Sequence, residues 1–329
     1  MPAIGATYPN LSDWARRLDP EGRIAQIVEI LNETNGVLNS MVFLEGNLPD
    51  GHKTTIRSGL PEPTWRTLNY GVQPSKSRTV QVTDTIGMLE AFSKVDKDLA
   101  DLNGNTAEFR LSEDRAFIEA MNQEMATTLF YGNTETDPEK FMGLAPRYND
   151  LSAENAENII VGGGSGSDNT SVWLVCWGPN TIHGIFPKGK MTGLQHEDMG
   201  KDVFSDGAGG EYVGYRSHYK WDVGLCLRDW RYVVRICNID VSDLTKNASS
   251  GADLIDLMVQ AIEIVPNITL GKAVFYCNKT ITSFLRRQIR NTSNVNLTLE
   301  NVEGRAVVRF DGIPVEKCDA ILNTEATVS

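Results

Sequence analysis

The sequence has few of the features that mark secreted, membrane or metal-binding proteins. It contains no run of about 18 apolar residues, the length that a membrane-spanning helix needs, and no basic start that leads into an apolar segment. We therefore expect neither a membrane span nor a secretory signal. Its cysteines show no Cys-x-x-Cys or Cys/His spacing, so we expect buried reduced thiols in a cytosolic environment, with no metal and no cofactor. They are Cys176, Cys226, Cys237, Cys277 and Cys318.

Positive charge is also scarce. The 329 residues carry 31 Lys and Arg against 43 Asp and Glu, which gives a formal net charge of -12. A protein whose task is to grip nucleic acid needs a basic surface, because contacts to phosphates dominate its affinity. The composition therefore argues against a dedicated nucleic-acid binder. It suits a surface that lies near DNA with only weak, non-specific contact.

No motif with the spacing of a catalytic site is present. The stretch Gly162–Ser167 lacks the Gly-Lys-Ser/Thr ending of a phosphate-binding loop, and we interpret it as a flexible connector. His196–Asp198, with Asp206, could in principle hold a metal, but such side chains in a glycine-rich loop are more often a solvated face. His183 and His218 stand alone and are interpreted as structural. A soluble enzyme that uses the His196 loop is one alternative; otherwise we expect no catalytic residues.

The longest regular pattern predicts one helix over Ser112–Tyr131. Ser112 is a suitable N-cap, and apolar residues recur at spacings of three and four, which draws one apolar stripe. These residues are Ile118, Met121, Met125 and Leu129. Gly132 follows where a residue in the left-handed conformation would end the helix. Such a helix is roughly 30 Å long at ~1.5 Å per residue.

Residues 46–80 are unlike the rest of the chain. Short β-like runs, Lys53–Arg57 and Thr64–Leu68, alternate with Gly and Pro breaks. Between His52 and Arg78 there are five Lys or Arg and one Glu, although the protein as a whole is acidic. Too few apolar residues lie here to form a core, so a long hairpin in this segment must rest on another surface.

The remaining segments predict strands that alternate with helices. We expect a long strand from Val80 and then a helical turn at 97–103. Further along we expect buried strands at 172–177 and 182–186, a surface hairpin or loop at 188–215, a strand-rich segment at 225–236, a helix at 252–264, a strand at 272–276, a helix at 280–291, and a hairpin formed by 297–302 and 306–310.

A short motif, Phe141-Met142-Gly143-Leu144, follows the long helix after a brief loop. A long helix that ends in Gly and is followed by Phe-x-Gly-Leu resembles the spine helix of tailed-phage major capsid proteins of the Hong Kong 97 type. The order of segments extends the resemblance over nearly the whole chain, and 46–144 looks similar to podophage coat proteins. The resemblance implies an α+β fold with an extended β-hairpin, known as the E-loop.

The domain organisation is also implied by the resemblance. The expected parts are 1–45, an N-terminal arm with one amphipathic helix; 46–80, the E-loop; 81–150, a peripheral domain with the spine helix at 112–131; 151–303, an axial domain; and 304–329, terminal strands that return to the peripheral domain. The family is structural, so no catalytic residue carries over.

The resemblance implies a structural protein that self-assembles as hexamers and pentamers into an icosahedral phage head around double-stranded DNA. It would be assembled in the host cytoplasm and located in the virion. Its implied partners are further copies of itself, a scaffolding protein, a portal and a cement or decoration protein, but no membrane. The shell protein of a bacterial nanocompartment, similar to an encapsulin, is an alternative with the same fold.

The resemblance also suggests which residues contact other subunits, because the E-loop of this family lies across its neighbour. A basic loop that meets an acidic neighbour gives electrostatic complementarity, which sets register and association rate. The helix expected at 280–291 carries further arginines in its last turns. The candidates are Lys53, Arg57, Trp65, Arg66, Lys76, Arg78, Arg286, Arg287 and Arg290.

Overall fold

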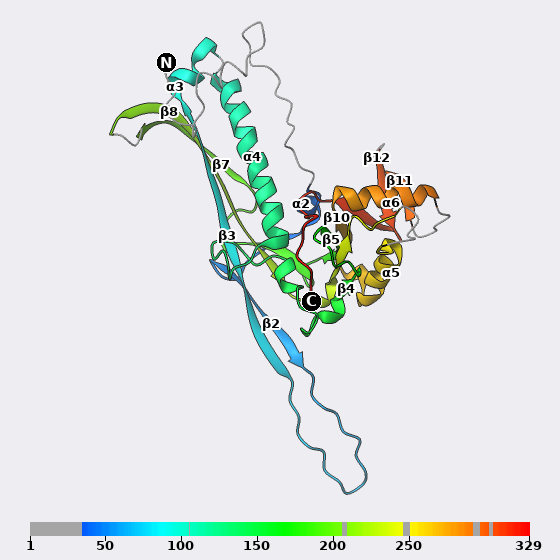
Figure 1. Ribbon diagram of the computed structural model, residues 1–329. Helices are drawn as coiled ribbons and strands as arrows, with labels where there is room; N and C mark the ends of the chain where they lie inside the picture. The colour runs from blue at the N-terminus through cyan, green and yellow to red at the C-terminus, as the bar shows by residue number, and fades with distance from the viewer. Residues whose placement is uncertain (1–34, 105, 206–208, 246–250, 292–296, 303–304) are drawn as a thin grey trace.

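A large mixed sheet runs through the molecule, with one long helix beside it and one hairpin that projects from it (Figure 1). The computed structural model describes residues 35–329 except 105, 206–208, 246–250, 292–296 and 303–304. The amphipathic helix expected in the arm lies outside the described residues. Within the described ranges, no helix combines the length and the apolar character needed to cross a membrane.

The described elements alternate along the chain. The strands are β1 Phe43–Glu45, β2 Gly51–Gly59, β3 Arg78–Asp96, β4 Ile159–Val161, β5 Asn169–Trp177, β6 Ile182–Phe186, β7 Gln195–Ser205, β8 Glu211–Leu227, β9 Val233–Asp240, β10 Lys272–Cys277, β11 Leu297–Val302, β12 Arg305–Phe310 and β13 Ile313–Lys317. The helices are α2 Val37–Ser40, α3 Lys97–Ala100, α4 Thr106–Tyr131, α5 Leu254–Ile264 and α6 Lys279–Asn291. Short 3-10 turns lie at Leu102–Gly104, Ala145–Arg147, Ala156–Asn158, Trp230–Tyr232 and Ile268–Leu270.

The strands of the described ranges form one connected sheet. Its main path is β11-β12-β13-β10-β5-β6-β8-β3-β2. Beside this path, β1 pairs with β6, β7 with β8, and β9 with both β4 and β5. Parallel pairs such as β10 with β13 occur next to antiparallel pairs such as β10 with β5. With helices packed on it, this mixed sheet makes the α+β fold that was predicted.

Strand β3 takes part in two different ladders. Its residues 78–85 pair with β2, and its residues 86–96 pair with β8. One continuous backbone of 19 residues therefore joins the projecting β2–β3 hairpin to the body of the protein (Figure 1). The long strand and the helical turn predicted after it are confirmed.

Helix α4 begins earlier than the sequence pattern predicted. It starts at Thr106 and comprises 26 residues, or about 39 Å at ~1.5 Å per residue. Ser112 therefore lies inside the helix, and the prediction that it is the N-cap is wrong. The helix extends in this direction because residues 107–110 are mostly good helix formers, and the Thr106 hydroxyl is fixed by Asp101 at 2.8 Å.

The apolar stripe on α4 is buried along only part of its length. Ile118 is 41 % exposed, whereas the three later members of the stripe are buried, namely Met121, Met125 and Leu129. Ile118 is not buried because only the C-terminal part of α4 packs into the main core. Near its other end, Phe109 packs in a separate small cluster with Val95 and Leu99.

The exit of α4 is held by the Phe-x-Gly-Leu segment. The Leu144 N–H donates to the Leu129 carbonyl at 3.0 Å, and the Gly143 N–H donates to the Gly132 carbonyl at 2.7 Å. The segment thus satisfies carbonyls that the end of a helix leaves free. A Cβ on Gly143 would lie only 2.7 Å from the Thr128 oxygen. Gly132 has no positive φ, so the predicted left-handed stop is wrong: glycine is required here by the close approach of two backbones.

Two hydrophobic cores lie on opposite faces of β5. One core receives Trp173, Val175 and Trp177 and contains the C-terminal part of α4. The other receives the alternate side chains, beginning with Val172, and is covered by α5 and α6. Successive side chains of a strand point to opposite faces, so a strand covered on both faces has a continuous apolar sequence. The buried strand predicted at 172–177 is confirmed, and all five cysteines are buried and unpaired as expected.

The C-terminal tail is tied into the body by a buried network of charge and hydrogen bonds. Arg235 of β9 donates to the Glu325 carboxylate at 2.8 Å, and each side chain is 4 % exposed. The hydroxyls of Tyr131 and Ser171 donate to the same carboxylate. Since Tyr131 is the last residue of α4, the tail connects the long helix to β5 and β9.

Two local predictions are corrected by the structure. Thr64–Leu68 is not a strand: its residues are exposed, and no ladder partner faces them among the described strands. The glycine-rich stretch after β4 is attached and is not a free connector, because the N–H groups of Gly162 and Gly164 donate to the carbonyls of Cys237 and Asn238 at 2.8 and 2.7 Å.

The later predicted elements are confirmed with small shifts of their bounds. The surface segment at 188–215 contains a hairpin, formed by β7 and the first part of β8. Helix α5 begins at Leu254, because the Asp253 side chain accepts from the N–H groups of the first turn. The hairpin at 297–310 is formed by β11 and β12.

We expect the substitution Gly143→Ala to destabilise the protein. The added Cβ would lie only 2.7 Å from the Thr128 carbonyl oxygen. The Phe-x-Gly-Leu segment would have to move away from the end of α4 to remove this clash, and such overpacking typically lowers the free energy of unfolding by about 1–3 kcal/mol. Urea unfolding of the unassembled chain measures this change. Gly71→Ala is the matched control, because its Cβ would meet nothing within 4 Å. Equal stability of the two variants would contradict the close packing at the end of α4.

Candidate inter-subunit contact surfaces

The root of the β2–β3 hairpin is held by a buried ion pair. Arg147 lies just after the Phe-x-Gly-Leu segment and donates to Asp84 Oδ1 on β3 at 2.8 Å. The same guanidinium nitrogen donates to the carbonyls of Met142 and Leu225. The Asp84 side chain is 3 % exposed and that of Arg147 is 16 % exposed. Because water reaches this pair poorly, loss of either partner would leave a buried charge without compensation.

Hydrogen bonds from Asn47 support the outer edge of β2. The Asn47 amide donates to the Lys53 carbonyl at 2.8 Å and accepts from the Lys53 N–H at 2.7 Å. The Asn47 N–H donates to His52 Nδ1 at 3.2 Å. One asparagine side chain thus makes the two bonds that a paired strand would make at this position, and it fixes the direction in which β2 leaves the body.

Beyond Gly59 the hairpin opens into the irregular loop 60–77, which extends away from the rest of the chain (Figure 1). Every side chain of this loop is exposed, including large apolar ones. Those apolar side chains are Leu60, Trp65, Leu68, Tyr70 and Val72. Apolar side chains gathered on a surface in this way are typical of an interaction site.

The structure brings most of the predicted contact residues onto this one hairpin, and all of these are exposed. They are Lys53 and Arg57 on β2, Trp65, Arg66 and Lys76 in the loop, and Arg78 at the start of β3. The hairpin therefore presents a basic edge next to an apolar tip.

The predicted arginines of α6 lie on a different part of the molecule (Figure 1). Arg286 and Arg287 are exposed. The Arg287 guanidinium lies over the Phe284 ring, 4.3 Å from its centroid, and donates to Ser283. The side chain of Arg290 is outside the described part of the chain. These arginines do not join the basic edge of the hairpin, so they form a second, separate candidate surface.

A pocket that the sequence did not reveal lies between β3 and α4. Its apolar lining comes from segments far apart in the chain, namely Met88, Leu89, Met125, Phe141 and Val223. Glu124, Glu139 and Lys140 also line it, and the Lys140 ammonium pairs with Glu124 at 2.9 Å. The lining is therefore mostly apolar, with one more acidic than basic side chain.

The His196 segment does not form a site with its predicted partners. His196 lies on β7 and stacks on the Tyr219 ring, with centroids 4.8 Å apart. Asp198 pairs with Arg110 at 2.6 Å, and this guanidinium holds the pKa of the Asp198 carboxyl below its usual value. Asp206 lies outside the described residues. His196 and Asp198 thus each have a contact within the chain that accounts for their position.

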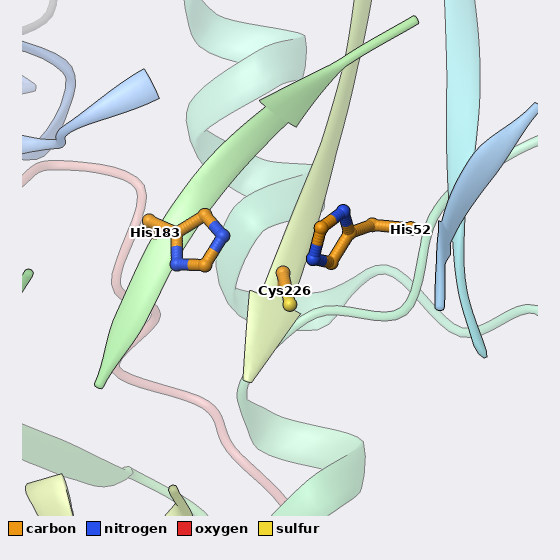
Figure 2. A group of neighbouring side chains, drawn as sticks. All are labelled: His52, His183 and Cys226. Carbon is orange, nitrogen blue, oxygen red and sulfur yellow. The ribbon is translucent and has the colours of Figure 1, made fainter. Parts of the chain in front are cut away.

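The structure does bring together a different group, His52, His183 and Cys226 (Figure 2). His183 stands alone in the sequence but has His52 and Cys226 as neighbours in space, and its interpretation as structural stays a prediction. No spacing signal could have revealed the group, because its members come from β2, β6 and β8. These side chains could hold a metal ion.

Comparison with known proteins decides the family. A family model described as major capsid protein GP7 matches residues 19–329. The chain belongs to the GP7 family of major capsid proteins. A solved structure of bacteriophage Epsilon15 is 48% identical to it, with a TM-score of 0.77, over 100% of this chain and 99% of that chain. No curated protein matches.

More distant structures are similar to parts of this capsid protein. A capsid chain of a native GTA particle is 10% identical over 67% of this chain and 95% of that chain, with a TM-score of 0.44. The encapsulin of Synechococcus elongatus PCC 7942 is 10% identical over 74% and 95% of the two chains, with a TM-score of 0.43.

The predicted resemblance to a tailed-phage major capsid protein, with a Hong Kong 97-type fold, is confirmed by the family match and the Epsilon15 structure. The protein is a component of the virion that assembles with further copies of itself into a capsid shell. The family match and the Epsilon15 structure favour a phage capsid protein over the nanocompartment alternative.

We expect Arg147→Ala to destabilise the capsid protein strongly. The change leaves the Asp84 carboxylate buried without its cation, for which losses of about 3–5 kcal/mol are typical. Urea unfolding of the unassembled chain measures the loss, and hydrogen exchange should locate it at the root of the hairpin. Arg231→Ala is the matched control: its pair with Asp229 is at the surface, with a 55% exposed arginine, and such pairs contribute only ~0–1 kcal/mol. A loss for Arg147→Ala no larger than for the control would show that the ion pair does not hold the root.

Proposed function

We propose that this capsid protein assembles as hexamers and pentamers into an icosahedral phage head that encloses double-stranded DNA. The observation that carries the proposal is the β2–β3 hairpin, which leaves the body with a basic edge and an apolar tip exposed. In a closed shell a neighbouring subunit would cover this tip. Because each subunit offers and receives the same contact, many weak contacts together hold the shell.

The pocket between β3 and α4 is our candidate for the surface that receives the hairpin. Its apolar lining suits an aromatic side chain, and Trp65 in the loop is fully exposed. The acidic residues of its lining, Glu124 and Glu139, suit the basic edge formed by Lys53 and Arg57. Opposite charges placed this way steer encounter and fix register more than they add affinity.

The proposed division of the chain follows the shell function. Residues 1–45 would be an arm, 46–80 the E-loop, 81–150 the peripheral domain, 151–303 the axial domain, and 304–329 the returning terminal segment. The segment 304–329 contacts both proposed domains. Its strand β13 pairs with β10 of the axial domain, whereas Glu325 accepts from Tyr131 at the end of α4 in the peripheral domain. We therefore assign the return to the peripheral domain to the tail after β13.

The proposed partners are a scaffolding protein, a portal and a cement or decoration protein, with assembly in the host cytoplasm. DNA would lie near the inner surface in weak, non-specific contact, since the net charge is -12. We propose that the protein has no catalytic activity of its own. A reproducible turnover that is lost in His196→Ala would contradict this.

We expect simultaneous substitution of Lys53, Arg57 and Arg66 by Glu to leave a folded chain that forms few or no particles. All three side chains are exposed, so little native packing is lost, but the edge of the hairpin becomes acidic and repels an acidic neighbour. Circular dichroism tests the fold, and electron microscopy over a range of salt concentrations tests the particles.

The matched control for this variant changes three exposed basic residues outside the hairpin, Arg115, Lys188 and Lys279, to Glu. This control changes the net charge by the same amount as the hairpin variant, because each replaces three basic residues by Glu. Loss of particles in both variants would attribute the effect to net charge. Unfolding of the hairpin variant would mean that the hairpin belongs to the core, and normal assembly at every salt concentration would remove its electrostatic role.

We expect Trp65→Ala to raise the protein concentration needed for assembly without changing the stability of the unassembled chain. Trp65 is fully exposed within its own subunit, so its truncation removes no intramolecular packing, whereas a buried aromatic is a common energetic centre of an interface. Met191→Ala is the control, because Met191 is also a large exposed apolar residue. Light scattering during assembly should separate the two variants; identical curves would exclude Trp65 as an anchor.

A further inference from the structure

Two histidines and one cysteine meet at the root of the hairpin (Figure 2). His183 on β6 and Cys226 on β8 are direct partners in an antiparallel ladder, and His52 reaches them from β2. One ligand atom from each residue lies within 4.8 Å of the other two. Both rings and the thiol are turned toward a common point. His183 and Cys226 are buried and His52 is half-buried, so the group is accessible from one side.

We propose that this cluster binds a zinc ion and that the ion joins the hairpin root to the body of the capsid protein. Imidazole nitrogen and thiolate sulfur are ligands that Zn²⁺ prefers, whereas Mg²⁺ and Ca²⁺ prefer oxygen. Tetrahedral zinc holds such ligand atoms about 3.3–3.6 Å apart. Ligand atoms that lie up to 4.8 Å apart must therefore approach one another by about 1.2–1.5 Å, and we expect His52, which is half-buried on the projecting strand, to make most of this movement.

Asp84 provides the negative charge that such a site needs. It lies opposite His52 in the β2–β3 ladder and is 3% exposed. Its Oδ1 accepts from Arg147, and the carboxylate also interacts with the Cys226 thiol. Asp84 therefore offsets the charge of the ion from beside the group, while His52, His183 and Cys226 are the three protein ligands.

Zinc binding must release the proton of the Cys226 thiol, because the thiolate is the form that binds metals.

Two local effects oppose the ion. Arg228 repels an added cation, but the Asp84 carboxylate offsets it from beside the group. His52 Nδ1 accepts from the Asn47 N–H at 3.2 Å, which places the ring proton on Nε2. Coordination through Nε2 moves that proton and breaks this bond. Asn47 keeps its two side-chain bonds to Lys53, so the edge of β2 stays supported.

The test is zinc binding by the purified full chain, with Zn²⁺ alone as the probe. After exposure to Zn²⁺ and dialysis against metal-free buffer, elemental analysis should find stoichiometric zinc. Added Zn²⁺ should raise the unfolding temperature, because the ion binds the folded state. Replacement by Co²⁺ should give the near-ultraviolet charge-transfer absorption of a thiolate ligand.

Two variants remove ligands and two serve as controls. His52→Ala and Cys226→Ala should each weaken Zn²⁺ binding by at least ~10-fold, the effect that loss of even an outer partner can have. His196→Ala and Cys176→Ala should bind like the native chain, because His196 stacks on Tyr219 and Cys176 faces the other core. If Cys226→Ala fails to fold, zinc binding by His52→Ala tests the proposal alone. This variant should fold, because His52 is half-buried and lies on the projecting hairpin.

Substoichiometric zinc in the native chain, or a Co²⁺ complex without thiolate absorption, would overturn the proposal. Native-like affinity in His52→Ala would do the same. These measurements use unassembled protein, so their outcome does not depend on whether the hairpin contacts a neighbour in the shell.

Discussion

The structure depends on the unbroken hydrogen-bonded backbone of β3. Residues 78–85 of this strand carry the hairpin, and residues 86–96 are built into the body through β8. An exposed two-stranded ribbon is marginal in water by itself, so the hairpin keeps its shape because its second strand belongs to a larger sheet. The buried pair of Arg147 and Asp84 holds the strand where one ladder gives way to the other. A displacement of the hairpin is therefore passed through β3 to the body of the subunit.

Much of this fold could be predicted because certain segments obey one dominant physical rule. The segment 172–177 is apolar at every position, since both of its faces are covered. The segment 46–80 has positive charge without core-forming residues, so it had to be a surface projection. The end of α4 was recognisable from its short glycine motif, although the physical role of Gly132 differs from the one expected. It provides room for a second backbone, which local conformational preference does not reveal.

Other features could not be predicted because they arise only from tertiary contacts. The start of α4 at Thr106 depends on residues that are compatible with a helix but carry no strong signal. Exposure of Ile118 follows from where the body ends beneath the helix. The pocket between β3 and α4, and the group of His52, His183 and Cys226, combine residues from distant segments. Spacing along a sequence carries information about a site only when the site lies within one or two neighbouring elements.

The two ladders of β3 also give the hairpin the properties of a lever. Strand β2 has nine residues, so the paired arm is about 30 Å long at ~3.3 Å per residue, and a tilt of ~10° at the root would move its end by about 5 Å. The proposed hairpin contact can therefore be kept between subunits that meet at slightly different angles by a small change in one strand, while the packing of both cores stays unchanged.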